Sequence, residues 1–142
     1  MGQAWHARDG ASDSPERIAL VVEPDGARRA QAALALRGMG FKTYQTGCGG
    51  VGQFMASQLT LHAVVVDVVL PDLDGLQLIR RVRATSPQAI IVATAPQDQD
   101  WDVIAADAHN AGADYALRNF SGEALNAVLT GAPSSGYEAR AD

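Results

Sequence analysis

The amino-acid sequence predicts an α/β fold, in which a parallel β-sheet is covered by helices on both faces. Short apolar runs without alternation recur along the chain, and such runs are typical of strands buried on both sides. A segment with helical spacing follows each run, so that a strand–helix unit occurs five times. Strands and helices in this order favour right-handed crossovers and a single parallel sheet. The pattern fills residues 17–131, and we expect a flexible leader at 1–16 and a flexible tail at 132–142.

The first two units occupy residues 18–58. The apolar run 18–22 predicts a strand, and the helix expected at 26–37 follows Asp25, a favourable N-cap residue, and ends at Gly38. Residues 41–46 alternate in polarity, which indicates a strand at the edge of the sheet. A short helix fits residues 53–58.

The last three units follow the same scheme. Strands are predicted at 63–66, 89–93 and, with a weaker pattern, 115–117. The helix expected at 73–84 places Leu76, Ile79 and Val82 on one face. The next helix, 101–111, stops at Gly112, and the last, 122–129, begins after the N-cap residue Ser121.

Composition limits the classes of function. The 142 residues include 16 acidic and 11 basic ones, and the net charge of −5 argues against a dedicated nucleic-acid binder. One Cys excludes an internal disulfide framework and a Cys-based zinc cluster, which is typical of a reducing compartment. The sequence has neither an apolar run near the roughly 18 residues of a membrane span nor a visible secretory signal. We expect a cytoplasmic domain that is not bound to a membrane.

Polar residues follow four of the apolar strands, where each strand ends. They are Glu23, Asp67, Thr94 and Arg118. Because parallel strands end at the same edge of a sheet, we expect these four side chains to share one edge. Polar residues also cost little free energy wherever strands reach the surface, so no single one of these four residues indicates a functional site. The basic pairs and triplets of the predicted helices are expected on solvated faces away from this edge, at Arg28, Arg29, Arg80, Arg81 and Arg83.

This set of side chains has a chemical logic. Two carboxylates and a loop carbonyl are suitable ligands for Mg²⁺. A carboxylate is also the nucleophile in enzymes that form aspartyl phosphates. A hydroxyl and a guanidinium are suited to hold the oxygens of the added phosphoryl group.

The motifs around these residues resemble the receiver domain of two-component response regulators. The most specific stretch is 64–75, Val-Val-Val-Asp-Val-Val-Leu-Pro-Asp-Leu-Asp-Gly, and segments 20–25, 92–95 and 112–118 fit in order and spacing. The resemblance implies a flavodoxin-like, doubly wound (βα)5 fold with strand order 2-1-3-4-5. It also implies that Asp67 is the phosphoacceptor, with Glu23, Asp67 and the Val69 backbone carbonyl as ligands of Mg²⁺.

Two further residues acquire roles from the resemblance. Thr94 matches the switch hydroxyl that closes on the phosphoryl group, and Arg118 stands where the family has Lys. Tyr115 stands at the position of the switch aromatic, although a half-buried strand aromatic explains it equally well.

Three departures mark the sequence as an atypical receiver. Pro24 replaces one of two adjacent acids, so the Mg²⁺ site is weakened or lost, and Asp25 is either a substitute ligand or the helix cap. Arg118 keeps the positive charge of a Lys but not its geometry. Asn119 follows it where the family usually has Pro.

The resemblance implies a signalling function. A histidine kinase or phosphotransfer protein would phosphorylate Asp67, and catalysis would be limited to self-catalysed phosphotransfer and autodephosphorylation. The sequence leaves no room for a DNA-binding output domain, so we expect a stand-alone receiver that contacts no nucleic acid. Its output would be a downstream protein, or a homodimer formed through the fourth helix, fifth strand and fifth helix.

Two alternatives remain open at this stage. The first is a receiver-fold interaction module that works without phosphorylation, with Arg118 paired to Asp67 or Glu23. The second is a nucleotide site, because Gly47, Gly49 and Gly52 spell G-x-G-x-x-G and Asp67 follows about 20 residues later. Against the second, the motif follows an edge strand, and we expect its glycines to form a mobile loop.

Overall fold

The computed structural model describes residues 16–96, 99–118 and 120–131. Within them, five parallel strands form one sheet in the order β2-β1-β3-β4-β5, which confirms the expected topology. The strands are β1 (Ile18–Val22), β2 (Lys42–Thr46), β3 (Ala63–Asp67), β4 (Ile90–Thr94) and β5 (Tyr115–Leu117). The expected leader, apart from Glu16, and the expected tail lie outside the described residues.

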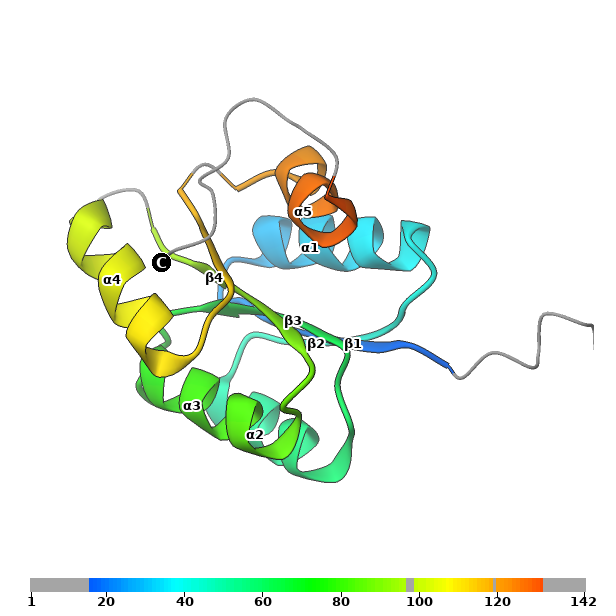
Figure 1. The fold of residues 1–142 in the computed structure, drawn as a ribbon, viewed down its shortest axis with the longest axis horizontal. Coiled ribbons are helices and arrows are strands. Elements are labelled where there is room, and N and C mark those ends of the chain that lie inside the picture. Colours follow the sequence, from blue (N-terminus) through cyan, green and yellow to red (C-terminus); the bar gives the residue numbers. More distant parts are fainter. Residues whose placement is uncertain (1–15, 97–98, 119, 132–142) are drawn as a thin grey trace, which may run out of the picture.

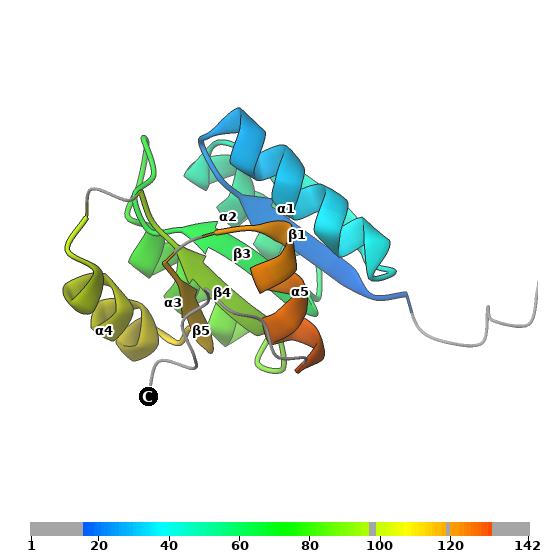
Figure 2. The same ribbon diagram turned by 90° about the horizontal axis from the view of Figure 1, so that it is seen from above.

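Five helices alternate with the strands and form a layer on each face of the sheet. Helices α1 and α5 pack together on one face, and α2, α3 and α4 cover the other (Figures 1 and 2). The helices are α1 (Gly26–Gly38), α2 (Gly49–Gln58), α3 (Gly75–Thr85), α4 (Trp101–Ala111) and α5 (Gly122–Thr130). None of the helices in the described part of the chain is long and apolar enough to cross a membrane.

The core explains why the central strands do not alternate in polarity. Successive residues of a strand point to opposite faces, and both faces are covered here. Leu20, Val64 and Ile91 pack on the side of α2, α3 and α4, whereas Val21, Val65 and Val92 pack on the side of α1 and α5.

The predicted helix ends depend on side-chain caps that the structure contains. Asp25, Asp74 and Ser121 each accept a hydrogen bond from a backbone N–H in the first turn of α1, α3 and α5. The start predicted for α3 was two residues too early, because Asp74 caps the helix and leaves Leu73 in the preceding loop.

Helix α2 contradicts the prediction of a mobile glycine loop. It begins at Gly49 rather than at residue 53. The carboxylate of Asp72 accepts hydrogen bonds of 2.8 Å from the backbone N–H groups of both Gly49 and Gly50. Gly52 packs against Val22 so closely that a Cβ would lie 2.6 Å from Cγ2 of that valine. Tertiary contacts therefore outweigh the low helix propensity of glycine in this segment.

Arg83 also departs from its expected place on a solvated helix face. Its guanidinium donates hydrogen bonds to the carbonyls of Gly112, Pro87 and Ala89 and forms a 2.8 Å ion pair with Asp114. The side chain thus ties the end of α3 to the start of β4 and to the turn before β5.

Candidate functional site: an acidic pair at the carboxyl edge of the sheet

Strand register brings the predicted strand-end residues together. Val22 pairs with Val66, so Glu23 and Asp67 each lie one residue beyond paired positions of β1 and β3. Asp67 pairs directly with Thr94 of β4. Thr94 pairs with Leu117, which places Arg118 one residue past the end of β5. The four residues therefore share one edge of the sheet, as predicted.

Glu23 and Asp67 form a buried acidic pair. Their side chains are only 4% and 2% exposed. Oδ1 of Asp67 accepts a 2.8 Å hydrogen bond from the Val69 N–H, and Oε2 of Glu23 accepts one of 3.0 Å from the Asp25 N–H. The backbone thus fixes one oxygen of each carboxylate.

The positive charge beside this pair comes from Arg28. Its guanidinium nitrogen Nη2 lies 3.5 Å from Oε2 of Glu23 and 3.6 Å from Oδ2 of Asp67. The expectation that Arg28 lies on a solvated face away from this edge was therefore wrong. The side chain of Arg118 is exposed, and the ion pair considered for Arg118 is made by Arg28 instead.

Burial governs the ionisation of Asp67. Burial and the neighbouring Glu23 raise the pKa of this carboxyl, the Val69 N–H and Arg28 lower it, and the net effect is a rise from 3.8 to about 7. Asp67 is consequently divided between its neutral and ionised forms near pH 7. A cation close to it favours the ionised form, and a carboxylate is a nucleophile only in that form.

Two buried polar atoms beside the pair have no hydrogen-bond partner among the described residues. They are Oγ1 of Thr94 and Nε of Arg28. A buried donor without a partner is costly, and a phosphoryl oxygen on Asp67 would supply an acceptor to such donors.

The loop after β3 holds Asp67 in position. It folds back through a bridge between Val69 and Asp74, and the first residue of α3, Gly75, lies against it. A Cβ at Gly75 would lie 2.5 Å from the Asp67 backbone oxygen and 2.6 Å from the Val68 Cα. Only glycine allows this approach of helix and strand.

The remaining candidate residues lie around the pair. Oδ1 of Asp25 accepts a 2.9 Å hydrogen bond from the Arg28 N–H, which holds the pKa of the Asp25 carboxyl below its usual value. Val69 is 42% exposed. Tyr115 is partly buried and packs against the core on the side of α1 and α5.

The two carboxylates offer oxygen atoms, which are the ligands that hard cations prefer. One nitrogen of Arg28 already contacts an oxygen of each of them, so both oxygens can be reached by a single cation. A third acid is missing, because Pro24 stands beside Glu23. Within residues 16–96, 99–118 and 120–131, no group of three or more His, Cys, Asp or Glu side chains is placed to hold a metal ion.

The glycine motif does not form a phosphate site in this structure. A nucleotide phosphate would need free N–H groups at the start of α2. Those of Gly49 and Gly50 are bonded to Asp72. Asp67, the acid expected to bind ribose, is buried at the edge of the central strands. The structure thus opposes the nucleotide alternative.

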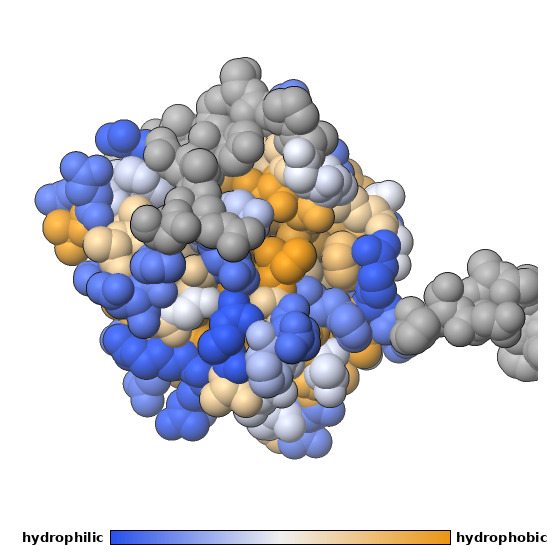
Figure 3. Space-filling model, viewed as in Figure 1, coloured by the Kyte–Doolittle hydropathy of each residue, from blue (hydrophilic) through white to orange (hydrophobic). Residues whose placement is uncertain are grey.

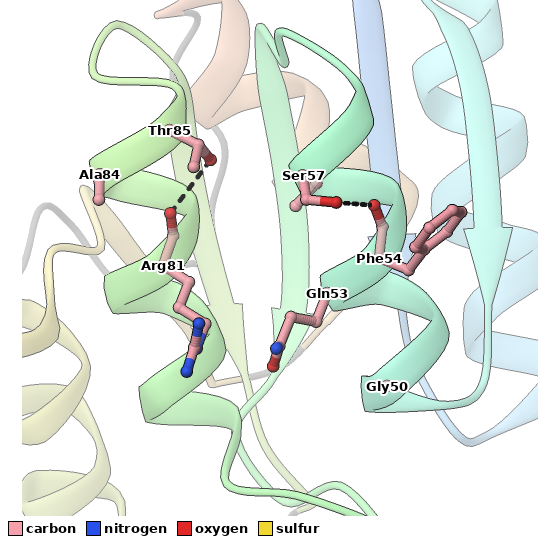
Figure 4. Close-up of a pocket in the computed structure, with 8 residues that line it drawn as sticks. Gly50, Gln53, Phe54, Ser57, Arg81, Ala84 and Thr85 are labelled. Carbon is pink, nitrogen blue, oxygen red and sulfur yellow. Dashed lines mark hydrogen bonds between the residues drawn. The ribbon is translucent and has the colours of Figure 1, made fainter.

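A separate pocket of about 410 Å³ lies between α2 and α3 and includes none of the strand-end residues. Figure 4 shows Gln53 and Arg81 extending into the space between these helices, whereas the Phe54 ring points away from α3. Figure 3 shows hydrophilic side chains gathered at the lower left of this face. On α3, Gln77, Arg80 and Arg81 are exposed.

Sequence reasoning missed Arg28, although a signal was present. The residue lies three positions after Asp25, in the first turn of a helix that starts at the carboxyl edge. Its side chain therefore had to begin near Glu23. Helix dipoles disfavour a cation in the first turn, which points to a compensating acid nearby.

Comparison with known proteins places this arrangement in context. The family model described as the response regulator receiver domain matches residues 19–129. The transcriptional regulatory protein AfsQ1 of Streptomyces coelicolor is 32% identical over 110 residues, which are 78% of this chain and 48% of that protein. The DNA-binding response regulator MtrA of Mycolicibacterium smegmatis is 29% identical over 80% of this chain and 49% of its own length. The chain thus spans about half the length of these relatives.

Solved structures show the same fold. The BeF3-activated receiver domain of DrrB, from Thermotoga maritima, superposes with a TM-score of 0.69 at 25% identity, over 82% of this chain and 96% of that one. A CheY-like receiver domain protein from Methanospirillum hungatei gives a TM-score of 0.72 at 18% identity, over 82% and 93% of the two chains.

Proposed function

Because the chain belongs to the response regulator receiver domain family, we propose that it accepts a phosphoryl group on Asp67 from a histidine kinase or a phosphotransfer protein. The observation that carries this proposal is the buried Asp67 carboxylate, which lies beside Glu23 and opposite a Thr94 hydroxyl that has no partner in the described structure. Receiver domains are signalling domains, so turnover would be limited to self-catalysed phosphotransfer and autodephosphorylation.

The reaction is a transfer between two nucleophiles. An oxygen of ionised Asp67 attacks phosphorus, the P–N bond of the donor phosphohistidine breaks, and the electron pair leaves with the imidazole. Glu23, Asp67 and the Val69 carbonyl would hold Mg²⁺, which when bound neutralises charge on the phosphoryl oxygens. Asp25 would join them only by leaving its cap on α1.

The phosphoryl group would then reach the rest of the domain through three side chains. Thr94 would donate its free hydroxyl to a phosphoryl oxygen, and Arg118 would turn inward from its exposed position to bind another. Tyr115 would follow Thr94 and change the α4–β5–α5 face. We propose that this face contacts a downstream protein or a second copy of the chain, in the cytoplasm and without nucleic acid, in keeping with the net charge of −5.

Labelling with a small phosphodonor tests the proposal. Wild-type protein incubated with Mg²⁺ and acetyl phosphate should gain a phosphoryl group that hydroxylamine removes, whereas Asp67→Asn should gain none. Asp72→Asn is the matched control, since this exposed acid follows Asp67 by five residues and lies in the same loop. An equal adduct on Asp67→Asn, or none on wild type, would overturn the proposal.

The second candidate is a receiver-fold module that binds its partner without phosphorylation. Arg28 supports it, because an internal cation already balances part of the charge that a metal would balance. Under this candidate wild type is not labelled at saturating Mg²⁺. Labelling of wild type at Asp67 would rule it out.

A further inference from the structure

Arg28 is held at a place where its own helix disfavours it. It is the third residue of α1, whose N-terminus is capped by Asp25 and has no acidic residue in its first turn. The positive end of the helix dipole repels a cation at this position. The attraction that compensates comes from acids outside the helix: Asp25 contributes to it, and Glu23 and Asp67 form ion pairs with Arg28.

The contacts of Arg28 with Glu23 and Asp67 are loose enough for another cation to replace it. Distances of 3.5 and 3.6 Å to the two carboxylates are longer than charge-assisted hydrogen bonds, and the buried Nε has no partner in the described structure. The Arg28 side chain is 28% exposed, whereas those of its two acids are 4% and 2% exposed. The guanidinium therefore lies between the two buried carboxylates and the solvent.

We propose that Arg28 is the resident cation of the Glu23–Asp67 pair, and that a divalent metal ion enters this site only by displacing it. A single nitrogen of Arg28 contacts both carboxylates, so the guanidinium and the metal require the same oxygens. Pro24 follows Glu23, and its side chain offers a metal ion no oxygen in place of those that Arg28 contacts. The inference rests on the proposed function in one respect: it takes the Glu23–Asp67 pair as the part of the site that binds the metal ion.

Metal titration without any phosphodonor tests the inference. Mn²⁺ binding is followed by the loss of the free-ion electron paramagnetic resonance signal, and Mg²⁺ binding by calorimetry. Arg28→Met should bind both ions at least about tenfold more tightly than wild type, a change of about 1.4 kcal/mol. Arg80→Met is the matched control, because it removes the same charge from an exposed position on α3.

Two further variants locate the effect and cover a loss of folding. Adding Glu23→Gln to Arg28→Met should abolish the gain in affinity. Arg28→Lys keeps the charge but replaces the planar fork by a point charge, and should give an intermediate affinity if Arg28→Met does not fold.

The outcomes are distinct from those of the labelling experiment. Affinities of Arg28→Met and Arg80→Met within about threefold of each other would overturn the inference, as would a gain that survives Glu23→Gln. If Arg28→Met does not fold, an Arg28→Lys affinity no higher than that of wild type overturns it. Absence of a phosphoryl adduct together with an intact gain in affinity would reject the proposed function and leave this inference standing.

Discussion

Asp67 is a residue whose charge state changes in the physiological pH range. Its pKa is raised to about 7, mainly by burial, so ionisation costs more in the folded domain than in the unfolded chain. The folded state is therefore favoured at low pH, and this contribution is lost as the pH rises from about 4 through about 7.

The neutral variant Asp67→Asn should remove this pH dependence. We expect its free energy of unfolding to exceed that of wild type at pH 8 by on the order of a few kcal/mol, and by much less at pH 5. Urea unfolding at the two pH values measures the difference. Asp107→Asn, an exposed site on α4, is the control. A difference that does not grow with pH would contradict the raised pKa.

At the scale of residues, the sequence predicted where the acids lie but not which residue balances their negative charge. The apolar strands end at polar residues, so Glu23, Asp67, Thr94 and Arg118 could be assigned to one edge in advance. Arg28 was missed although its place in the first turn of α1 lies near Glu23, because helical spacing assigns a residue to a face but does not give the reach of a long side chain. The same limit applies to Arg83, whose guanidinium contacts two other segments.

At the scale of elements, helix α2 depends on a carboxylate from a different loop. Hydrogen bonds from Gly50 and Gly49 lower the pKa of Asp72, so its stabilising effect is present above the usual carboxyl pKa and is lost as the pH falls below the lowered value. Asp72→Ala should lower the melting temperature at pH 7 by a few degrees and speed amide exchange in α2. An unchanged exchange rate in α2, measured beside Asp107→Ala, would contradict this role.

Two glycines at the ends of helices, Gly75 at the start of α3 and Gly38 at the end of α1, should respond in opposite ways to substitution by alanine. Gly75→Ala places a Cβ 2.5 Å from backbone that cannot move aside, and should cost about 1–3 kcal/mol. Gly38→Ala meets no atom within 4 Å at the end of α1 and should stabilise by about 0.5–1 kcal/mol. Thermal and urea unfolding of both variants decide the matter. Equal effects would contradict the close approach of α3 to β3.

The elements themselves were largely predictable, and α2 shows where prediction fails. Apolar runs and caps set the bounds of β1, β5 and α4 as observed. The first turn of α2 was missed because glycine disfavours a helix locally, whereas the stabilising contacts come from Asp72 and Val22.

At the scale of the whole molecule, the order of the strands predicts that inner strands resist local unfolding more strongly than edge strands. Strands β1, β3 and β4 lie inside the sheet and their residues are almost all fully buried, whereas β2 and the three-residue β5 are its edges. Amides of the three inner strands should exchange only on global unfolding, and those of β5 earliest among the strands. Hydrogen-exchange mass spectrometry tests this ordering. Protection of β5 equal to that of β3 would contradict it.

The alternation of strands and helices predicted the fold class, whereas the order of the strands came only from the family resemblance. Hydrophobic patterns describe which faces are covered and do not encode which strands are neighbours. In the observed order β1 and β3 are neighbours, which brings both acids side by side at the same edge.

That order also makes any ligand of the acidic pair a cross-link between distant parts of the chain. Glu23 belongs to the first strand–helix unit and Asp67 to the third strand, so the pair exists only while β1 and β3 remain joined. A cation that binds both acids therefore binds the folded state alone and stabilises the whole domain by mass action. Changes in divalent-ion concentration would then alter the free energy of unfolding of the whole domain.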